Sequence, residues 1–105
     1  MRARVRLIAV DAGRAFGLSG GIEAVHAAMA RHSDNAAVMA QCCFAIHSIS
    51  LHDDCASELV QRQSIAKVID ILNRFPLDPD VQEHGCWSIF NLTRDGTRLR
   101  ACASE

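Results

Sequence analysis

The stretch from Val81 to Thr93 reads VQEHGCWSIFNLT, and an earlier stretch, from Val38 to Ser50, reads VMAQCCFAIHSIS. Both begin with Val, carry Cys at the sixth place and Ile at the ninth, and place a large aromatic residue directly after the Cys. The copies are 43 residues apart, and the similarity extends without a gap back to Ile22 and Ile65. Self-similarity with a period of about 40–47 residues is typical of proteins built from stacked helical units. The sequence therefore predicts an all-α repeat architecture.

The composition of the 105-residue chain fits a single domain. Hydrophobic residues make up 50% of it, enough for a core, whereas aromatic residues make up 5%, which favours closely packed helices. The formal net charge of −1 argues against a nucleic-acid partner, because such proteins carry a basic stripe. No apolar run has the length needed to cross a membrane. The odd count of five Cys, without a secretory signal, leads us to expect reduced thiols in the cytoplasm or the nucleus.

Helix-breaking residues and hydrophobic periodicity predict helices throughout and no strands. The Gly pair at 20–21 and the polar run at 33–35 each end a helix. Ser64 is a predicted N-cap, as is Asp78, which is followed by Pro79 in the first helical turn. The predicted helices span residues 11–19, 22–32, 36–50, 55–62, 65–75 and 79–94. In the last three long helices the predicted inward positions are Val38, Cys42, Ala45, Ile46 and Ile49; Ile65, Val68, Ile69 and Leu72; and Val81, Gly85, Ile89 and Leu92.

Residues 1–10, MRARVRLIAV, carry three Arg and no acidic residue, which leaves two interpretations open. One is a targeting peptide, because transit peptides are rich in Arg and poor in acidic residues. The other, which we favour, is the end of a preceding repeat, since run 8–14 shares with run 92–98 the pattern apolar–small–x–Asp–x–x–Arg. The single domain, 1–105, then divides into a tail of a preceding repeat (1–19), two helices of the first unit (20–53), a complete repeat (54–94) and the start of a truncated repeat (95–105).

Two runs carry a resemblance to a known family: Gly-Gly-Ile-x-x-Val at 20–25 and Val-x-x-x-x-Cys-Trp-x-Ile-x-Asn-Leu at 81–92. With the unit of about 43 residues, they make nearly the whole chain similar to the armadillo repeat family. The resemblance implies a right-handed α-α superhelix with three helices per repeat, whose third helices line a concave groove for extended peptides. The first copy departs from the pattern, with Phe44 in place of Trp and Ser48 in place of Asn, and the second has Gln63-Ser64 in place of the Gly pair.

The peptide-binding groove that the resemblance implies is centred on Trp87 and Asn91, which are i and i+4 and are therefore expected on one helical face. The Asn amide offers a donor and an acceptor to a peptide bond, and the Trp ring offers a cation–π surface to Arg or Lys. The alternative is that Trp87 packs between repeats and Asn91 caps a backbone group. The full predicted groove comprises Trp87, Asn91, Glu83, His84 and Arg94 of the second copy, and Gln41, Phe44 and Ser48 of the first.

The sequence carries no nucleotide-binding, zinc-protease or hydrolase motif. Its five His and five Cys lack the tight paired spacing of zinc sites, and Cys43 and Cys86 are explained as equivalent positions of the repeat. His84 and Cys86 are i and i+2, so they do not face each other on a helix as a catalytic pair would. We therefore expect a protein that is not an enzyme and uses no metal or cofactor.

The predicted function is that of a protein–protein interaction module, or scaffold, which binds an extended peptide or partner protein in the groove. Two alternatives stay open: the repeats recruit substrates within a larger enzyme or signalling protein, or they form a receptor of nuclear-transport type for basic peptides. The expected partners are proteins or peptides, and not nucleic acid or membranes. Because repeat arrays need polar caps and none is evident here, self-association through the repeat ends is a further expectation.

Overall fold

The computed structural model describes residues 15–94, and all the regular structure in that range is helical, so the all-α prediction is confirmed there. Residues 1–14 and 95–105 lie outside the described residues, and with them the start of the predicted first helix, most of the predicted tail and the truncated repeat. The elements in chain order are the π-helical turn η1 (Gly17–Gly21), α2 (Ile22–Arg31), α3 (Ala36–Ile49), α4 (Asp53–Gln61), α5 (Ser64–Arg74) and α6 (Pro79–Thr93).

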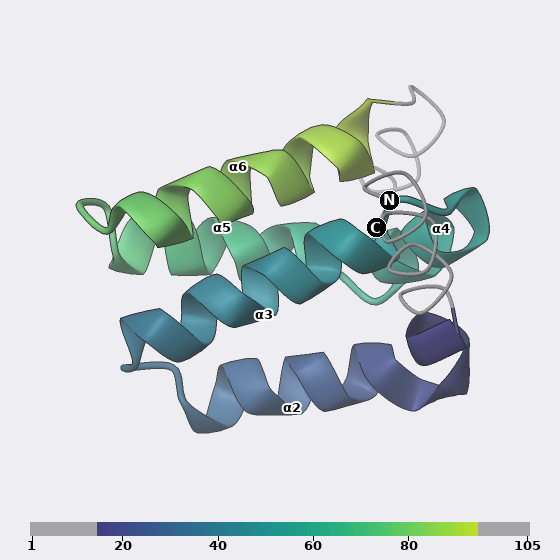
Figure 1. Ribbon diagram of the computed structural model, residues 1–105, viewed down its shortest axis with the longest axis horizontal. Helices are drawn as coiled ribbons and strands as arrows, with labels where there is room; N and C mark the ends of the chain where they lie inside the picture. Colours follow the sequence, from purple (N-terminus) through teal and green to yellow (C-terminus); the bar gives the residue numbers. More distant parts are fainter. Residues whose placement is uncertain (1–14, 95–105) are drawn as a thin grey trace, which may run out of the picture.

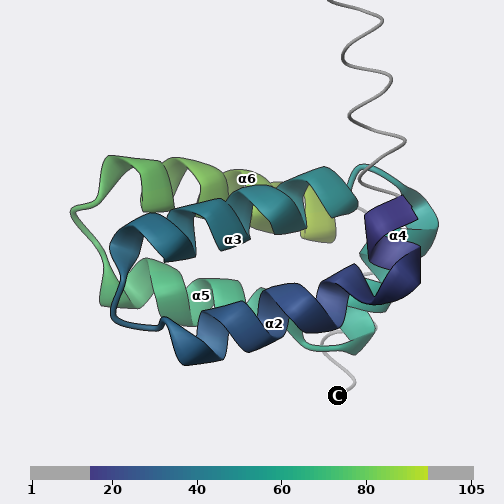
Figure 2. The ribbon, with the colours of Figure 1, turned by 60° about the horizontal axis from the view of Figure 1, so that its bottom comes forward.

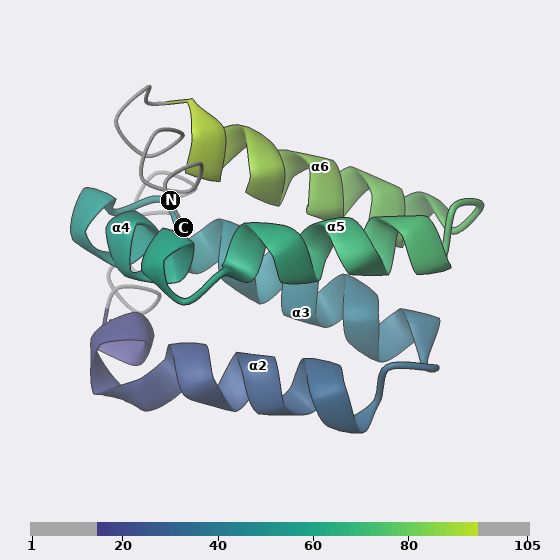
Figure 3. The same ribbon diagram turned by 180° about the vertical axis from the view of Figure 1, so that it is seen from behind.

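The four longer helices form two layers (Figure 1). Figure 2 shows α3 and α6 side by side in one layer, with α2 and α5 in the other. The short elements η1 and α4 lie together at one end of both layers, which is seen again from behind in Figure 3. The two copies of the sequence repeat therefore contribute one helix each to each layer.

Two helix starts are fixed by side-chain caps. Asn35 Oδ1 accepts a hydrogen bond of 3.1 Å from the Val38 N–H and so begins α3. Asp78 Oδ1 accepts from the N–H groups of Asp80 and Val81, at 3.1 and 3.0 Å, with Pro79 in the first turn of α6. The predicted Asp78 cap is confirmed, because a short acidic side chain satisfies two N–H groups that the helix itself leaves without partners.

The chain enters α2 and α5 through the same backbone conformation. Gly20 has φ +94°, and Gln63, its equivalent in the second copy, has φ +64°. Ser64 is not the N-cap that the sequence predicts, because Gln63 precedes the helix and Ser64 is its first residue. The Ser64 hydroxyl is instead fully buried and lies 2.7 Å from His26 Nε2, a hydrogen bond that ties α5 to α2.

The core lies between the layers and continues from one repeat into the other. Met39, Ile46 and Ile49 of α3 and Val81 and Leu92 of α6 are at most 1% exposed. The Ser88 hydroxyl, also fully buried, donates to the Cys43 carbonyl oxygen at 2.7 Å and so joins α6 to α3.

One inward position is wrong in the predicted set. Ile69 is 45% exposed, and Ile71 is buried in its place, at 5%. Helix α5 carries apolar residues on more than one side, so periodicity alone does not decide which side faces inward. Packing against α2 and α3 decides it.

Candidate functional site

Aromatic side chains gather over α3 and α6, where Phe44, Trp87 and Phe90 are 48%, 52% and 58% exposed. The centroid of the Phe44 ring lies 5.2 Å from that of His84, and the Trp87 centroid lies 5.9 Å from that of Phe90, both edge to face. His47 joins the two pairs, at 6.3 Å from Phe44 and 6.2 Å from Trp87. We name these five residues the aromatic seam.

The aromatic seam follows from the repeat. Phe44 and Trp87 occupy equivalent places in the two copies, and α3 and α6 lie side by side (Figure 1). Within each helix the members are three residues apart, so they share one helical face. Single exposed apolar residues are ordinary, but a contiguous group marks a surface suited to contact with a partner.

His47 is the half-buried member at the centre of the aromatic seam. Burial holds the pKa of His47 below its usual value, and the nearby His84 lowers it further. Because an exposed imidazole titrates near pH 6.5, His47 is largely neutral at pH 7. Its ring therefore extends the aromatic surface without adding a cation.

The predicted groove residues lie at different depths. Gln41, Phe44, Glu83, Trp87 and Arg94 are exposed, Ser48 and His84 are half-buried, and Asn91 is buried. Arg94 lies at the end of α6, where its Nη2 is 3.8 Å from Asp53 Oδ1 of α4. The structure thus brings Phe44, His84 and Trp87 together, while Arg94 turns to α4.

Trp87 and Asn91 do not present one common exposed face. Trp87 is 52% exposed, whereas Asn91 is 5% exposed. Four residues turn an α-helix by about 40° beyond one full turn, and on α6 this rotation leads toward buried Ser88 and Leu92. Three residues turn it by about 60° the other way, which places Phe90 on the open side. The Asn91 amide is therefore an interior group in this structure.

Sequence reasoning missed two members of the aromatic seam, His47 and Phe90. They are equivalent positions of the two copies, each three residues after the aromatic residue that follows the Cys. The family pattern directs attention to the i+4 residue, Asn91. The residues three positions after Phe44 and Trp87 are both aromatic rings, which is the sequence signal for the missing pair.

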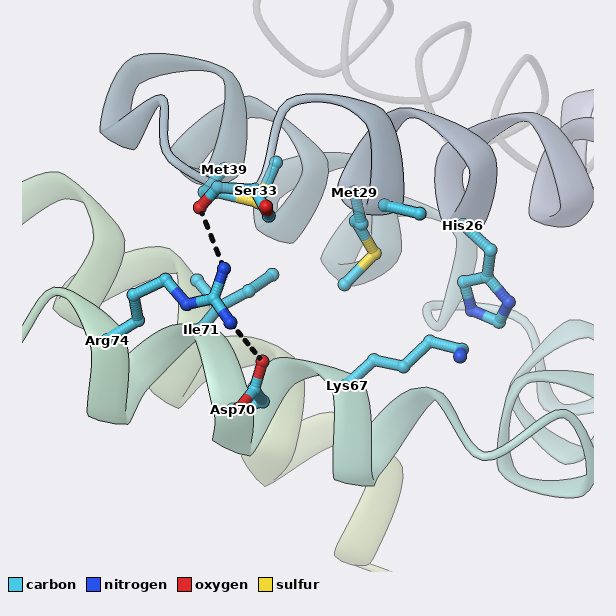
Figure 4. Close-up of a pocket in the computed structure, with 9 residues that line it drawn as sticks. His26, Met29, Ser33, Met39, Lys67, Asp70, Ile71 and Arg74 are labelled. Atoms are coloured by element: carbon cyan, nitrogen blue, oxygen red, sulfur yellow. Dashed lines mark hydrogen bonds and ion pairs between the residues drawn. The ribbon is translucent and has the colours of Figure 1, made fainter.

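A hollow of about 260 Å³ lies between α2 and α5 in the other layer (Figure 4). Met29 and Ile71 supply apolar side chains to it. Arg74 spans it, donating from Nη1 to the Ser33 carbonyl oxygen at 3.3 Å, with Nη2 3.4 Å from Asp70 Oδ2. Its guanidinium already links α5 to the end of α2, so the hollow is a junction between repeats.

The cysteines of the described range are chemically distinct. Cys43 is fully buried, and burial, followed by the neighbouring Cys42, raises its pKa to about 12. Cys86, its equivalent on α6, is exposed. Within residues 15–94 no group of three or more His, Cys, Asp or Glu side chains is placed to hold a metal ion. No helix in that range combines the length and apolar character needed to cross a membrane.

Comparison of the chain with family models, with curated proteins and with solved structures finds no match. Function is therefore inferred from the repeat and from the aromatic seam itself.

Proposed function

We propose that this chain is an armadillo-type repeat module, without enzyme activity, that binds an extended segment of a partner protein along the aromatic seam. The two-layer arrangement supports this, because equivalent helices of consecutive units lie side by side (Figure 2). The left-handed residues Gly20 and Gln63, before α2 and α5, also support it, since the chain changes direction at the equivalent position in each unit. In this proposal the units stack as a right-handed superhelix with three helices each.

The observation that carries the proposal is the continuity of the aromatic seam. Its neighbouring ring centroids are 5.2 to 6.3 Å apart and cross from α3 to α6 without interruption. In an extended peptide, alternate side chains point the same way and are about 6.5–7 Å apart. Successive side chains on one side of such a peptide can therefore contact successive rings.

The chemistry of the aromatic seam favours a segment with apolar and basic side chains. Trp and Phe faces accept aliphatic stems and the cationic heads of Arg or Lys, worth about 0.5–1 kcal/mol at exposed sites. The neutral imidazole of His47 does not repel such a cation. The exposed carboxylate of Glu83, next to His84 on α6, adds an attractive charge.

The first test is selection of peptides from a displayed library of random 12-residue sequences. We expect peptides enriched on the native chain to be lost on Trp87→Ala and on Phe44→Ala. Each loss should be about tenfold or more in affinity, as for central aromatic contacts in other interfaces. Leu77→Ala is the matched control, because Leu77 is a large apolar side chain, 93% exposed, outside the aromatic seam.

Direct binding can be read from fluorescence, because Trp87 is the only Trp and the chain has no Tyr. A selected peptide should shift the Trp87 emission to shorter wavelength in the native chain and in Leu77→Ala. Equal enrichment on all four proteins, with no change in Trp87 emission, would place the binding surface elsewhere and refute the proposal. Circular dichroism of each variant establishes equal helicity beforehand.

A further inference from the structure

An apolar groove of about 440 Å³ opens between α2 and α3, on the side away from α5 and α6. Among residues 15–94, no charged side chain lines it. Its lining includes Phe16, Val25, Ala28, Val38, Cys42 and Ala45. This groove is distinct from the aromatic seam.

The second repeat shows what normally fills this position. Moved by one repeat of 43 residues, Phe16 becomes Leu59, and its exposure of 45% becomes 0%. The half-buried Val38 likewise becomes Val81, which is fully buried. At these two positions the side chain is covered in the second repeat and more open in the first.

The cover over the second repeat is formed by α3 and α2 of the first. Half-buried Ala45 has Ser88 as its equivalent, and Ser88 is fully buried with its hydroxyl on the Cys43 carbonyl oxygen at 2.7 Å. Ala28 has Ile71 as its equivalent, 5% exposed. The groove therefore has the equivalent position and the apolar character of a surface on which another repeat packs.

The chain carries the complementary surface at its other side. The side chains by which the first repeat covers the second include Met29, Cys43 and Ile46, which are 7%, 0% and 0% exposed. Their equivalents one repeat later are Leu72, Cys86 and Ile89, of which Cys86 is exposed and the others half-buried. The exposed Ile69 extends this surface, which we name the outer face.

We propose that a second copy of this chain occupies the groove with its outer face, so that copies stack head to tail. The contact repeats between molecules the interface that already joins the two units within one molecule. It pairs different surfaces of the two copies, so it does not close after two, and longer arrays form as concentration rises.

One difference sets the strength of this contact. Buried Ala40 has exposed Glu83 as its equivalent, so a carboxylate borders the outer face where the intramolecular interface has a methyl group. Desolvating a charge opposes association. We expect a dissociation constant on the order of 10–100 μM, far weaker than a permanent complex.

The test is sedimentation velocity of the full chain from roughly 5 μM to 1 mM, a range that brackets the expected constant. The average mass of the native chain should rise across this range. Ala28→Glu places a charge in the groove, and Cys86→Glu places one on the outer face. Each variant alone should stay monomeric, because every contact needs one intact groove and one intact outer face.

An equimolar mixture of the two variants is the decisive sample. The intact groove of Cys86→Glu can accept the intact outer face of Ala28→Glu, so the mixture should form dimers and nothing larger. Ala45→Glu and Ile69→Glu repeat the experiment at independent positions, and circular dichroism shows that each variant is folded. Phe44→Ala should associate like the native chain, which separates this inference from the proposed function.

Three results would overturn the inference. A native chain that stays monomeric over the whole range leaves the groove to another part of the same chain or to a different protein. A mixture that fails to dimerise, while the native chain associates, indicates a symmetric contact or another surface. Association that persists unchanged in Ala28→Glu and Ala45→Glu shows that the groove is not the contact.

Discussion

His47 acquires its properties from its neighbours on α3 and α6. It lies between the exposed rings of Phe44 and Trp87 and is itself half-buried. Burial and the neighbouring His84 depress its pKa, and the pKa of His26 is depressed by burial and, to a smaller degree, by Lys67. Both imidazoles are therefore more easily protonated in the unfolded chain than in the folded one.

This difference predicts that the free energy of unfolding decreases as pH falls through about 6.5. Between the depressed folded pKa values and the unfolded value of about 6.5, the unfolded chain binds more protons, so acid favours unfolding. Above about pH 7.5 both histidines are neutral in either state, and this contribution vanishes. Urea unfolding at pH 7.5 and 5.5 measures the change. His26→Gln and His47→Gln should each reduce it, and an undiminished change in the double variant would contradict the assignment.

At the scale of elements, α2 and α5 are each preceded by a residue in the left-handed conformation. Glycine adopts this conformation freely, whereas for other residues it costs roughly 1–2 kcal/mol. Gly20 suits its place, and Gln63 stands at the equivalent place with φ +64°. The second repeat therefore carries a local strain that the first avoids.

Replacement of this glutamine should stabilise the protein. Gln63→Gly is expected to raise the free energy of unfolding by about 0.5–1 kcal/mol, the relief of strain being partly offset by the greater freedom of Gly in the unfolded chain. Gln61→Gly, in the last turn of α4, is the matched control and should lower it. Urea denaturation of both variants decides the point. A loss of stability in Gln63→Gly would mean that the Gln side chain contributes more than its backbone costs.

The same scale shows what the sequence can and cannot predict. The start of α6 was predictable, because Asp78 and Pro79 act locally through the backbone beside them. The inward side of α5 was not, because Ile69 and Ile71 are both apolar and only neighbouring helices distinguish them. The repeat placed Phe44 and Trp87 near each other, but the turn that buries Asn91 depends on how α6 is rotated against α3.

For the whole molecule, the main consequence is that neither repeat has a core of its own. Ile46 of the first repeat and Leu92 of the second are fully buried in one continuous core. Ser88 and Cys43 add a hydrogen bond across the boundary. Folding of one repeat without the other would expose this shared surface to water.

The two repeats should therefore unfold together. Ile46→Ala is expected to lower the free energy of unfolding by about 2–5 kcal/mol through the lost contacts and the cavity left behind. The transition should stay single, with the same midpoint by circular dichroism, which reports all helices, and by Trp87 fluorescence, which reports the second repeat. Ile69→Ala, at a 45% exposed position, is the control and should cost far less. Separate midpoints for the two probes would show that the repeats are independent.

Because Cys43 is buried, its covalent modification can report how often the core opens. Only a thiolate reacts readily with alkylating reagents, and the Cys43 sulfur is both fully buried and protonated at neutral pH. Separation of α3 from α6 exposes it, and each such opening lets a reagent attach irreversibly. Rare openings of the core therefore accumulate as alkylated Cys43, which is detected as an increase in mass.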